Sequence, residues 1–145
     1  MIGLIQRVKR AQVMVEDETI GHINTGILLL LGVEKNDTSS STKKLSKKVA
    51  NLRIFPDEEG KMNRSLLDIK GELLVISQFT LVADTAKGNR PGFSNSAPPA
   101  LGKSLYCEFI EHFSCTYSTC KSGRFGANMQ VELINDGPAT FYLNV

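Results

Sequence analysis

The segment from Gly26 to Val33, GILLLLGV, is the longest apolar run in the chain. It is much shorter than the roughly 18 apolar residues that a membrane-spanning helix requires. Because it is apolar at alternate positions and also between them, it is typical of a strand that is covered on both faces. We therefore expect a sheet with this strand in a central position.

The residues before this run have the alternation of strands. Val13 and Val15 alternate with polar neighbours, residues 16–18 (Glu-Asp-Glu) predict a turn, and residues 19–23 predict the next strand. The chain therefore begins with strands that can pair beside the central one.

Two segments have the spacing of amphipathic helices. Thr38 or a nearby serine can cap the first, and Pro98-Pro99 stand where the second can begin. Their apolar stripes comprise Leu45, Val49 and Leu52 in the first helix and Leu101, Leu105, Phe109 and Phe113 in the second. Lysines between residues 43 and 48 form the opposite face of the first helix. We interpret that face as solvated, with a phosphate contact as the alternative.

Strands outnumber helices, and the two helices are far apart in the sequence. This order predicts an α+β fold, with a largely antiparallel, barrel-like sheet and two main helices. The 145 residues, 41% apolar and 22% charged, are enough for one domain over residues 1–145. No membrane partner is expected. Because the N-terminus lacks the basic start and cleavage site of a secretory signal, we expect a cytoplasmic protein.

The common hydrolytic motifs are absent from the sequence. It has no G-x-S-x-G elbow, no H-E-x-x-H and no phosphate-binding G-x-x-x-x-G-K-[ST]. Spacing gives neither His22 nor His112 an acid partner, and the three cysteines form no C-x-x-C pair. We therefore expect no metal and no cofactor. The net charge of +2 is too small for a broad nucleic-acid surface, so a nucleic-acid partner would be touched locally.

The segment Ser77-Gln78-Phe79-Thr80 interrupts the apolar strand predicted over residues 71–83. A strand broken in this way can turn backbone N–H groups out of the ladder and towards a developing oxyanion. Thr80 could act as a nucleophile, but the sequence offers it no base. The alternative interpretation is a β-bulge with a polar edge.

Near the end of the chain, residues 135–140 (NDGPAT) lie between two apolar runs. Asn, Asp, Gly and Pro are the usual turn residues, so composition predicts a break between two strands. A plain hairpin does not require Gly137-Pro138, because Asn-Gly alone would suffice. The pattern itself therefore leaves the use of this proline open.

Several motifs occur together in a specific order and spacing. They are IQRV at residues 5–8, SQFTL at 77–81, RPGF at 90–93, GRFGANMQV at 123–131 and NDGPAT at 135–140. In this combination the chain resembles the D-aminoacyl-tRNA deacylases, also called D-tyrosyl-tRNA deacylases, over nearly its whole length. It departs from their usual pattern at Gly92, where Ser is often seen, and at Ala139, where Val is frequent.

The resemblance implies an activity and a homodimer. Such enzymes hydrolyse the ester that joins a D-amino acid to the 3′-terminal adenosine of tRNA, release the free D-amino acid and tRNA, and spare the L-form. Clearance of glycyl-tRNA is a further implied activity. The resemblance also implies that Gly137-Pro138 is a cis peptide that enters the pocket of the other subunit. Asn135, Thr140 and Arg7 belong to the same chiral-selection region, in which Arg7 braces the segment.

The same resemblance assigns the catalytic residues to Ser77, Gln78, Phe79 and Thr80. Backbone N–H groups around Gln78 and Phe79 are the implied oxyanion site. Because Thr80 has no base, assistance by the ribose 2′-hydroxyl of the tRNA is the alternative to direct catalysis by a side chain.

Phe125 and Met129 are expected to cover the terminal adenine by stacking and apolar contact, with the protein core as their alternative place. Two other functions remain open. One is a non-catalytic RNA-binding module, which would require a broader basic surface. The other is a small-molecule esterase or amidase that uses Thr80 or Ser77. No DNA partner is expected.

Overall fold

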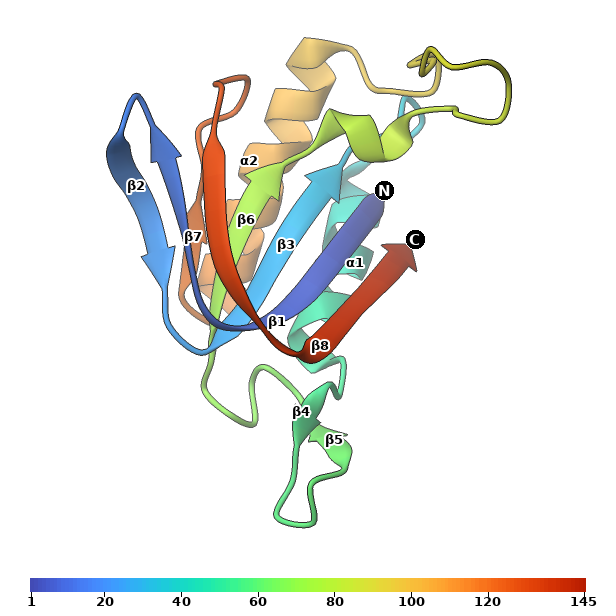
Figure 1. Ribbon diagram of the computed structural model, residues 1–145. Coiled ribbons are helices and arrows are strands. Elements are labelled where there is room, and N and C mark those ends of the chain that lie inside the picture. Colours follow the sequence, from blue (N-terminus) through green and yellow to red (C-terminus); the bar gives the residue numbers. More distant parts are fainter.

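The computed structural model describes residues 1–145, and β1 (Ile2–Val15) is the strand around which its sheet is built. Five other strands complete this sheet: β2 (Glu18–Ile23), β3 (Gly26–Gly32), β6 (Glu72–Ser77), β7 (Cys120–Ser122) and β8 (Gln130–Asn144). β1 pairs antiparallel with β2, β3 and β8, whereas the pairs β3–β6 and β6–β7 are parallel. The sheet is therefore mixed, and with its helices the fold is α+β, as expected (Figure 1).

A tight hairpin joins β1 to β2. Val15 pairs with Glu18, and the two residues between them, Glu16 and Asp17, have φ angles of 52° and 62°. Positive φ at both central positions is the geometry of a type I′ turn, whose twist suits the flanking strands. The predicted turn is confirmed, with Glu18 already in the second strand.

The composition of β3 correctly predicted a central strand. It lies between β1 and β6, and Leu30 is the only one of its seven residues that is not fully buried. Leu29 and Leu31 belong to the large core beneath the helices, whereas Leu28 belongs to a second core on the other face of the sheet. Both faces of the strand are apolar because each is covered by a different core.

Two helices, α1 (Ser39–Asn51) and α2 (Pro99–Thr116), cover one face of the sheet (Figure 1). The fully buried residues of their predicted stripes are Leu45, Val49, Leu105, Phe109 and Phe113. The N–H of Thr38 donates to Ser41 Oγ at 3.3 Å, which caps the start of α1. Both predicted helices are confirmed. Neither has the length and apolar character of a membrane span.

On the face away from the helices, the sheet curves until β2 approaches β7. A Cβ atom at Gly21 would lie 3.1 Å from the carbonyl oxygen of Ser122, so the two strands meet where one of them carries no side chain. Residues inside this curve, among them Val13 and Leu74, are fully buried although no helix covers them. The barrel-like sheet predicted from the sequence is therefore confirmed as a nearly closed one.

Three short elements differ from the sequence predictions. β4 (Phe55–Pro56) and β5 (Met62–Arg64) form a small hairpin of their own, which was not predicted (Figure 1). The strand predicted over residues 71–83 ends at Ser77, and a 3₁₀ turn, η1 (Phe79–Val82), replaces its second half. The prediction that the strand resumes is wrong because β3 ends at Gly32 and offers no further partner edge.

β8 runs from Gln130 to Asn144 without the break predicted at residues 135–140. On β1, Gln6 pairs with Thr140 and Val8 with Asn135, so residues 136–139 stand opposite Arg7 alone. The prediction of two strands separated by a break is therefore corrected to one strand with a large, four-residue bulge. The strand resumes on the same partner because β1 is long enough to pair with both halves.

Candidate active site

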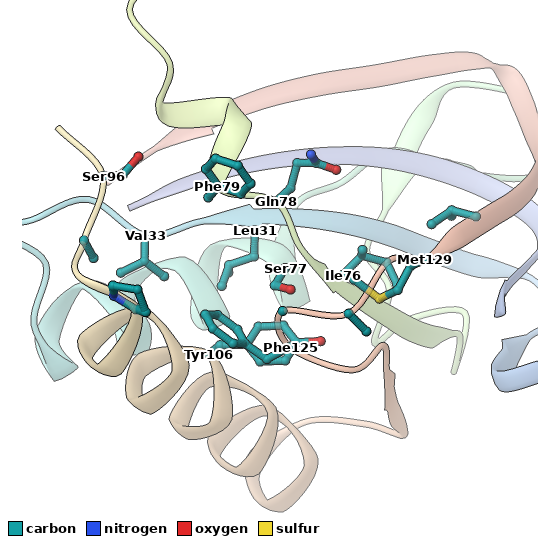
Figure 2. A pocket seen from close by; sticks show the side chains of 16 residues that line it. Leu31, Val33, Ile76, Ser77, Gln78, Phe79, Ser96, Tyr106, Phe125 and Met129 are labelled. Atoms are coloured by element: carbon teal, nitrogen blue, oxygen red, sulfur yellow. The ribbon is translucent and has the colours of Figure 1, made fainter. Parts of the chain in front are cut away.

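A cavity of about 520 Å³ opens between the end of β6, the start of α2 and the segment that leads into β8. Figure 2 shows Phe79 on one side of it, Phe125 and Tyr106 on the other, and Ser77 between them. Most of its lining is apolar, and the polar side chains are those of Ser77, Gln78, Ser96 and Tyr106. A largely apolar cavity of this size with a few polar groups is typical of a small-ligand site.

The chain turns sharply at the polar wall of the cavity. The N–H of Gln78 donates to Leu31 O at 2.8 Å and is the last bond of β6 to the sheet. The N–H of Leu81 then donates to Gln78 O at 3.2 Å and closes the 3₁₀ turn. This turn lifts the Phe79 side chain to the rim, where it is 61% exposed.

The two N–H groups implied as the oxyanion site are therefore not equivalent. That of Gln78 is engaged with Leu31 O. That of Phe79 precedes the first donor of the 3₁₀ turn, and such N–H groups have no partner within the turn. Of the two, the N–H of Phe79 is therefore the candidate backbone donor at this wall.

Thr80 lies outside the cavity. Its side chain is exposed, it is not among the lining residues, and its hydroxyl accepts a hydrogen bond from the side-chain amide of Gln78. Ser77, Gln78 and Phe79 do line the cavity. Of the four residues predicted to be catalytic, three therefore line the cavity and Thr80 lies outside it.

The opposite wall is aromatic and is held by Tyr106, which sequence reasoning did not identify. The rings of Tyr106 and Phe125 lie 5.7 Å apart, and Met129 lines the same cavity. The Tyr106 hydroxyl donates to Val75 O at 2.9 Å and lies 3.2 Å from Gly123 O. It therefore ties α2 to the end of β6 and to the loop before Phe125. Its only sequence signal is that it stands three residues before Phe109 on the apolar stripe of α2, which predicts burial and not a place in the cavity lining.

Tyr106 is the only titratable residue that lines the cavity. Burial raises the pKa of its phenol well above the usual value of 10.0. His22 is exposed on β2, and His112 contacts Thr116 and Tyr117 at the far end of α2. No carboxylate, imidazole, thiol or amine is thus available at the wall to act as a general base.

The second group of predicted site residues lies on the β8 bulge and not in this cavity. Gly137-Pro138 is a cis peptide, as the resemblance implied, and both residues are exposed. The Nε of Arg7 donates to Asp136 O at 2.7 Å, and its Nη1 donates to Ile54 O at 2.5 Å. Arg7 is 8% exposed, so these bonds are shielded from water.

Asn135 and Thr140 close the two ends of the bulge. The Oδ1 of Asn135 accepts from the N–H of Ala139 at 2.7 Å, and its Nδ2 donates to Gln6 Oε1 at 2.9 Å and to Thr140 Oγ1 at 3.2 Å. The predicted chiral-selection residues therefore form one braced unit. This unit and the cavity are separate parts of the same chain.

The backbone matches two solved structures closely. One, a probable eukaryotic D-amino acid tRNA deacylase, has a TM-score of 0.83 over 98% of both chains at 16% identity, which shows a shared fold. The other, a c-Myc DNA unwinding element binding protein, has a TM-score of 0.95 at 41% identity and covers 100% of this chain and 99% of its own. The fold is therefore that of the deacylase class.

Sequence comparison identifies the family. The model described as D-Tyr-tRNA(Tyr) deacylase matches residues 4–144. A D-aminoacyl-tRNA deacylase of Pseudoalteromonas atlantica is 62% identical, and one of Idiomarina loihiensis is 55% identical, each over 100% of both chains. The chain belongs to the D-Tyr-tRNA(Tyr) deacylase family.

Proposed function

We propose that this chain, as one domain over residues 1–145, hydrolyses D-aminoacyl-tRNA in the cytoplasm, where the aminoacyl-tRNA pool lies. Water attacks the ester carbonyl carbon, the bond to the 3′-oxygen of the terminal adenosine breaks, and a free D-amino acid and tRNA result. The observation that carries the proposal is that one cavity has an aromatic wall at Phe125 and, opposite it, a wall at Phe79 where backbone polar groups are the candidate donors. The first suits a nucleobase and the second an ester carbonyl.

The adenosine end of the substrate would lie against Phe125 and Met129. A base that stacks on an aromatic side chain needs no hydrogen-bond code, and every tRNA ends in the same adenosine. The aminoacyl ester would then extend towards Ser77 and the N–H of Phe79. That N–H would stabilise the oxyanion, and a single donor of this kind is worth about 10²–10³-fold in rate.

Because no side chain in the cavity lining can act as a general base, catalysis assisted by the substrate itself is favoured. The ribose 2′-hydroxyl lies next to the 3′-ester in any aminoacyl-tRNA, so it can orient the attacking water or share its proton. The Thr80 hydroxyl would have to leave its bond with Gln78 and enter the cavity before it could attack. Support by the 2′-hydroxyl therefore fits the lining better than a threonine nucleophile does.

Discrimination between D and L esters requires an obstacle of fixed shape near Cα, because both esters have the same bonds. A thousandfold preference corresponds to about 4 kcal/mol in the transition state. Backbone that approaches the substrate closely is suited to this, since contacts to side chains of the substrate would exclude many D-residues. The segment around Gly137 can approach the substrate closely because Gly137 has no side chain. It is also held in a fixed position, since Arg7 donates a hydrogen bond to the neighbouring Asp136.

We propose that this segment comes from a second copy of the chain. Gly137 and Pro138 are exposed and do not line the cavity of their own chain. β8 also exposes Ile134 and Tyr142, at 43% and 59%, which gives a second copy an apolar surface to cover. A homodimer would place the Gly137-Pro138 segment of each copy at the cavity of the other.

The activity is tested with three substrates: D-Tyr-tRNA, L-Tyr-tRNA and free D-tyrosine ethyl ester. Rapid loss of the D-tRNA ester alone supports the proposal. Equal loss of both tRNA esters would contradict the proposed selection for the D-form. Rapid loss of the ethyl ester would favour a small-molecule esterase. Binding of tRNA without any turnover would favour an RNA-binding module.

The shared site is tested by co-expression of two variants that each lower turnover when expressed alone. Gly137→Ala alters the segment and leaves the cavity intact, whereas Phe125→Ala alters the cavity and leaves the segment intact. In a mixed dimer, one cavity would meet an unaltered segment, so activity should return when the two variants are co-expressed. If the wild type is active and the mixture is not, the segment and cavity do not come from different copies.

A further inference from the structure

Phe79 and Phe93 form an aromatic pair at the rim of the cavity. Their ring centroids lie 5.1 Å apart at an interplanar angle of 51°, yet Phe79 is 61% and Phe93 is 40% exposed. Single exposed apolar residues are common, but two aromatic rings that touch each other and remain open to water are a candidate contact surface. One ring comes from η1 and the other from the segment of residues 84–98.

The segment that carries Phe93 is fixed to the body of the protein. Asp84 and Gly92 exchange two backbone hydrogen bonds of 2.8 Å each, which close the loop before Phe93. Beyond it, the N–H of Lys35 donates to Asn95 O at 2.9 Å and that of Ala97 to Val33 O at 3.0 Å. The aromatic pair is thus held in place from both sides, as a preformed surface requires.

The pair is continuous with the proposed substrate site. Phe79 lines the cavity on one side and contacts Phe93 on the other. A strand of nucleotides whose last base lies against Phe125 must leave the cavity over its rim. A route past Phe79 brings the next nucleotide onto Phe93.

The charge of this region suits a polyanion. Lys87 and Arg90 are exposed on the same loop, between the two residues that close it, and neither has an acidic partner within 4.0 Å. Free cations beside an exposed aromatic pair are the combination that single-stranded nucleic acids use, with bases on the rings and phosphates on the cations.

We infer that Phe79 and Phe93 form a stacking surface for the base next to the terminal adenosine, with Lys87 and Arg90 beside its phosphates. This inference rests on the proposed function. It makes the enzyme a reader of the single-stranded end of the tRNA as well as of the amino acid and the terminal adenosine. It assigns Phe93 to binding and not to the chemical step.

Two substrates test this assignment: D-Tyr-tRNA and the D-tyrosyl ester of adenosine alone, which lacks the preceding nucleotide. For Phe93→Leu, which keeps apolar bulk and removes the ring, we expect KM for D-Tyr-tRNA to rise roughly tenfold. The adenosine ester should be hydrolysed as by the wild type. Phe93→Tyr, which keeps a ring, should restore the low KM. Arg90→Gln should flatten the salt dependence of KM for the tRNA only.

Other outcomes overturn the inference. An unchanged KM in Phe93→Leu would show that no base stacks there, and an equal loss on both substrates would show that Phe93 shapes the cavity itself. Dissociation of the Phe93→Leu protein in light scattering would assign the surface to a second copy of the chain. A wild-type protein that hydrolyses neither substrate would instead refute the proposed function.

Discussion

Arg7 donates from Nε to the carbonyl oxygen of Asp136 across 2.7 Å, while its Nη1 donates to the carbonyl oxygen of Ile54 at 2.5 Å. One buried guanidinium therefore links the end of the α1 region to the bulge of β8. Its Nε also lies 3.5 Å from Asp136 Oδ2, so the same residue neutralises the side chain of its partner. The position of the Gly137-Pro138 segment depends on this planar group of donors.

Replacement of Arg7 by lysine should release the bulge, because a single ammonium cannot reach two separate carbonyl groups with the geometry of a guanidinium. We expect Arg7→Lys to lower the free energy of unfolding by about 1–3 kcal/mol in urea titrations and to reduce turnover of D-Tyr-tRNA. Lys9→Gln is the matched control, since Lys9 is largely exposed and lies 3.8 Å from Asp136 Oδ1. It should change stability by less than about 1 kcal/mol. Wild-type stability and turnover in Arg7→Lys would show that the brace is unnecessary.

Gly137 cannot carry a side chain in its present conformation. Its φ is 151°, and a Cβ atom there would lie 2.8 Å from the backbone nitrogen of Ala139 and 3.1 Å from Arg7 Nη2. Gly137→Ala should therefore displace the segment, cost about 1–3 kcal/mol of stability and lower turnover. Gly60→Ala is the control, because Gly60 also has a positive φ, of 77°, but lies in open space. It should lose some stability and keep full turnover, whereas equal turnover in both variants would contradict the role of the segment.

The sequence predicted those elements whose pattern is set by burial. β3 and the two helices were recognised because their apolar residues face a core at the spacing that each element requires. β4 and β5, of two and three residues, are too short to show any alternation. The continuity of β8 escaped prediction for a different reason. Turn-forming composition describes only the local chain, whereas pairing with the 14-residue β1 decides whether a strand resumes.

The candidate site shows the same division. Ser77, Phe125 and Met129 were assigned to the substrate site through the resemblance, and all three line the cavity, although their roles there stay predictions. That the N–H of Gln78 is engaged could not be predicted, because the acceptor, Leu31 O, lies on another strand. The support given by Tyr106 likewise depends on how α2 packs against β6. Contacts between distant segments therefore decide which member of a motif is free to act.

Thr80 provides a test of where the chemistry comes from. Because its hydroxyl lies outside the cavity and is bonded to the side chain of Gln78, Thr80→Val should lower kcat by less than about tenfold. Single-turnover measurements on D-Tyr-tRNA separate this effect from product release. Removal of a true nucleophile typically costs on the order of 10⁶-fold. A loss of that size, with tRNA binding intact, would return Thr80 to the centre of the mechanism.

The thiol of Cys120 should make stability depend on pH in the alkaline range. Burial raises its pKa from an ordinary 9.0 to about 12. Since the folded chain keeps this proton to higher pH than the unfolded chain does, unfolding releases a proton between these two values. The free energy of unfolding should therefore fall as pH rises from 9 to 12, by up to about 1.4 kcal/mol per unit, and be unaffected by this thiol below pH 9.

This contribution is isolated by comparison of variants in urea unfolding between pH 8 and pH 11. Cys120→Ala should show a shallower fall of the free energy of unfolding with pH than the wild type, because the variant lacks the Cys120 thiol. Tyr106, whose pKa is raised by burial and also by the nearby Cys120, adds a fall of the same sign above pH 10, so the slopes are compared between pH 9 and pH 10. Identical slopes in the wild type and Cys120→Ala would show that the Cys120 thiol titrates as it does in the unfolded chain.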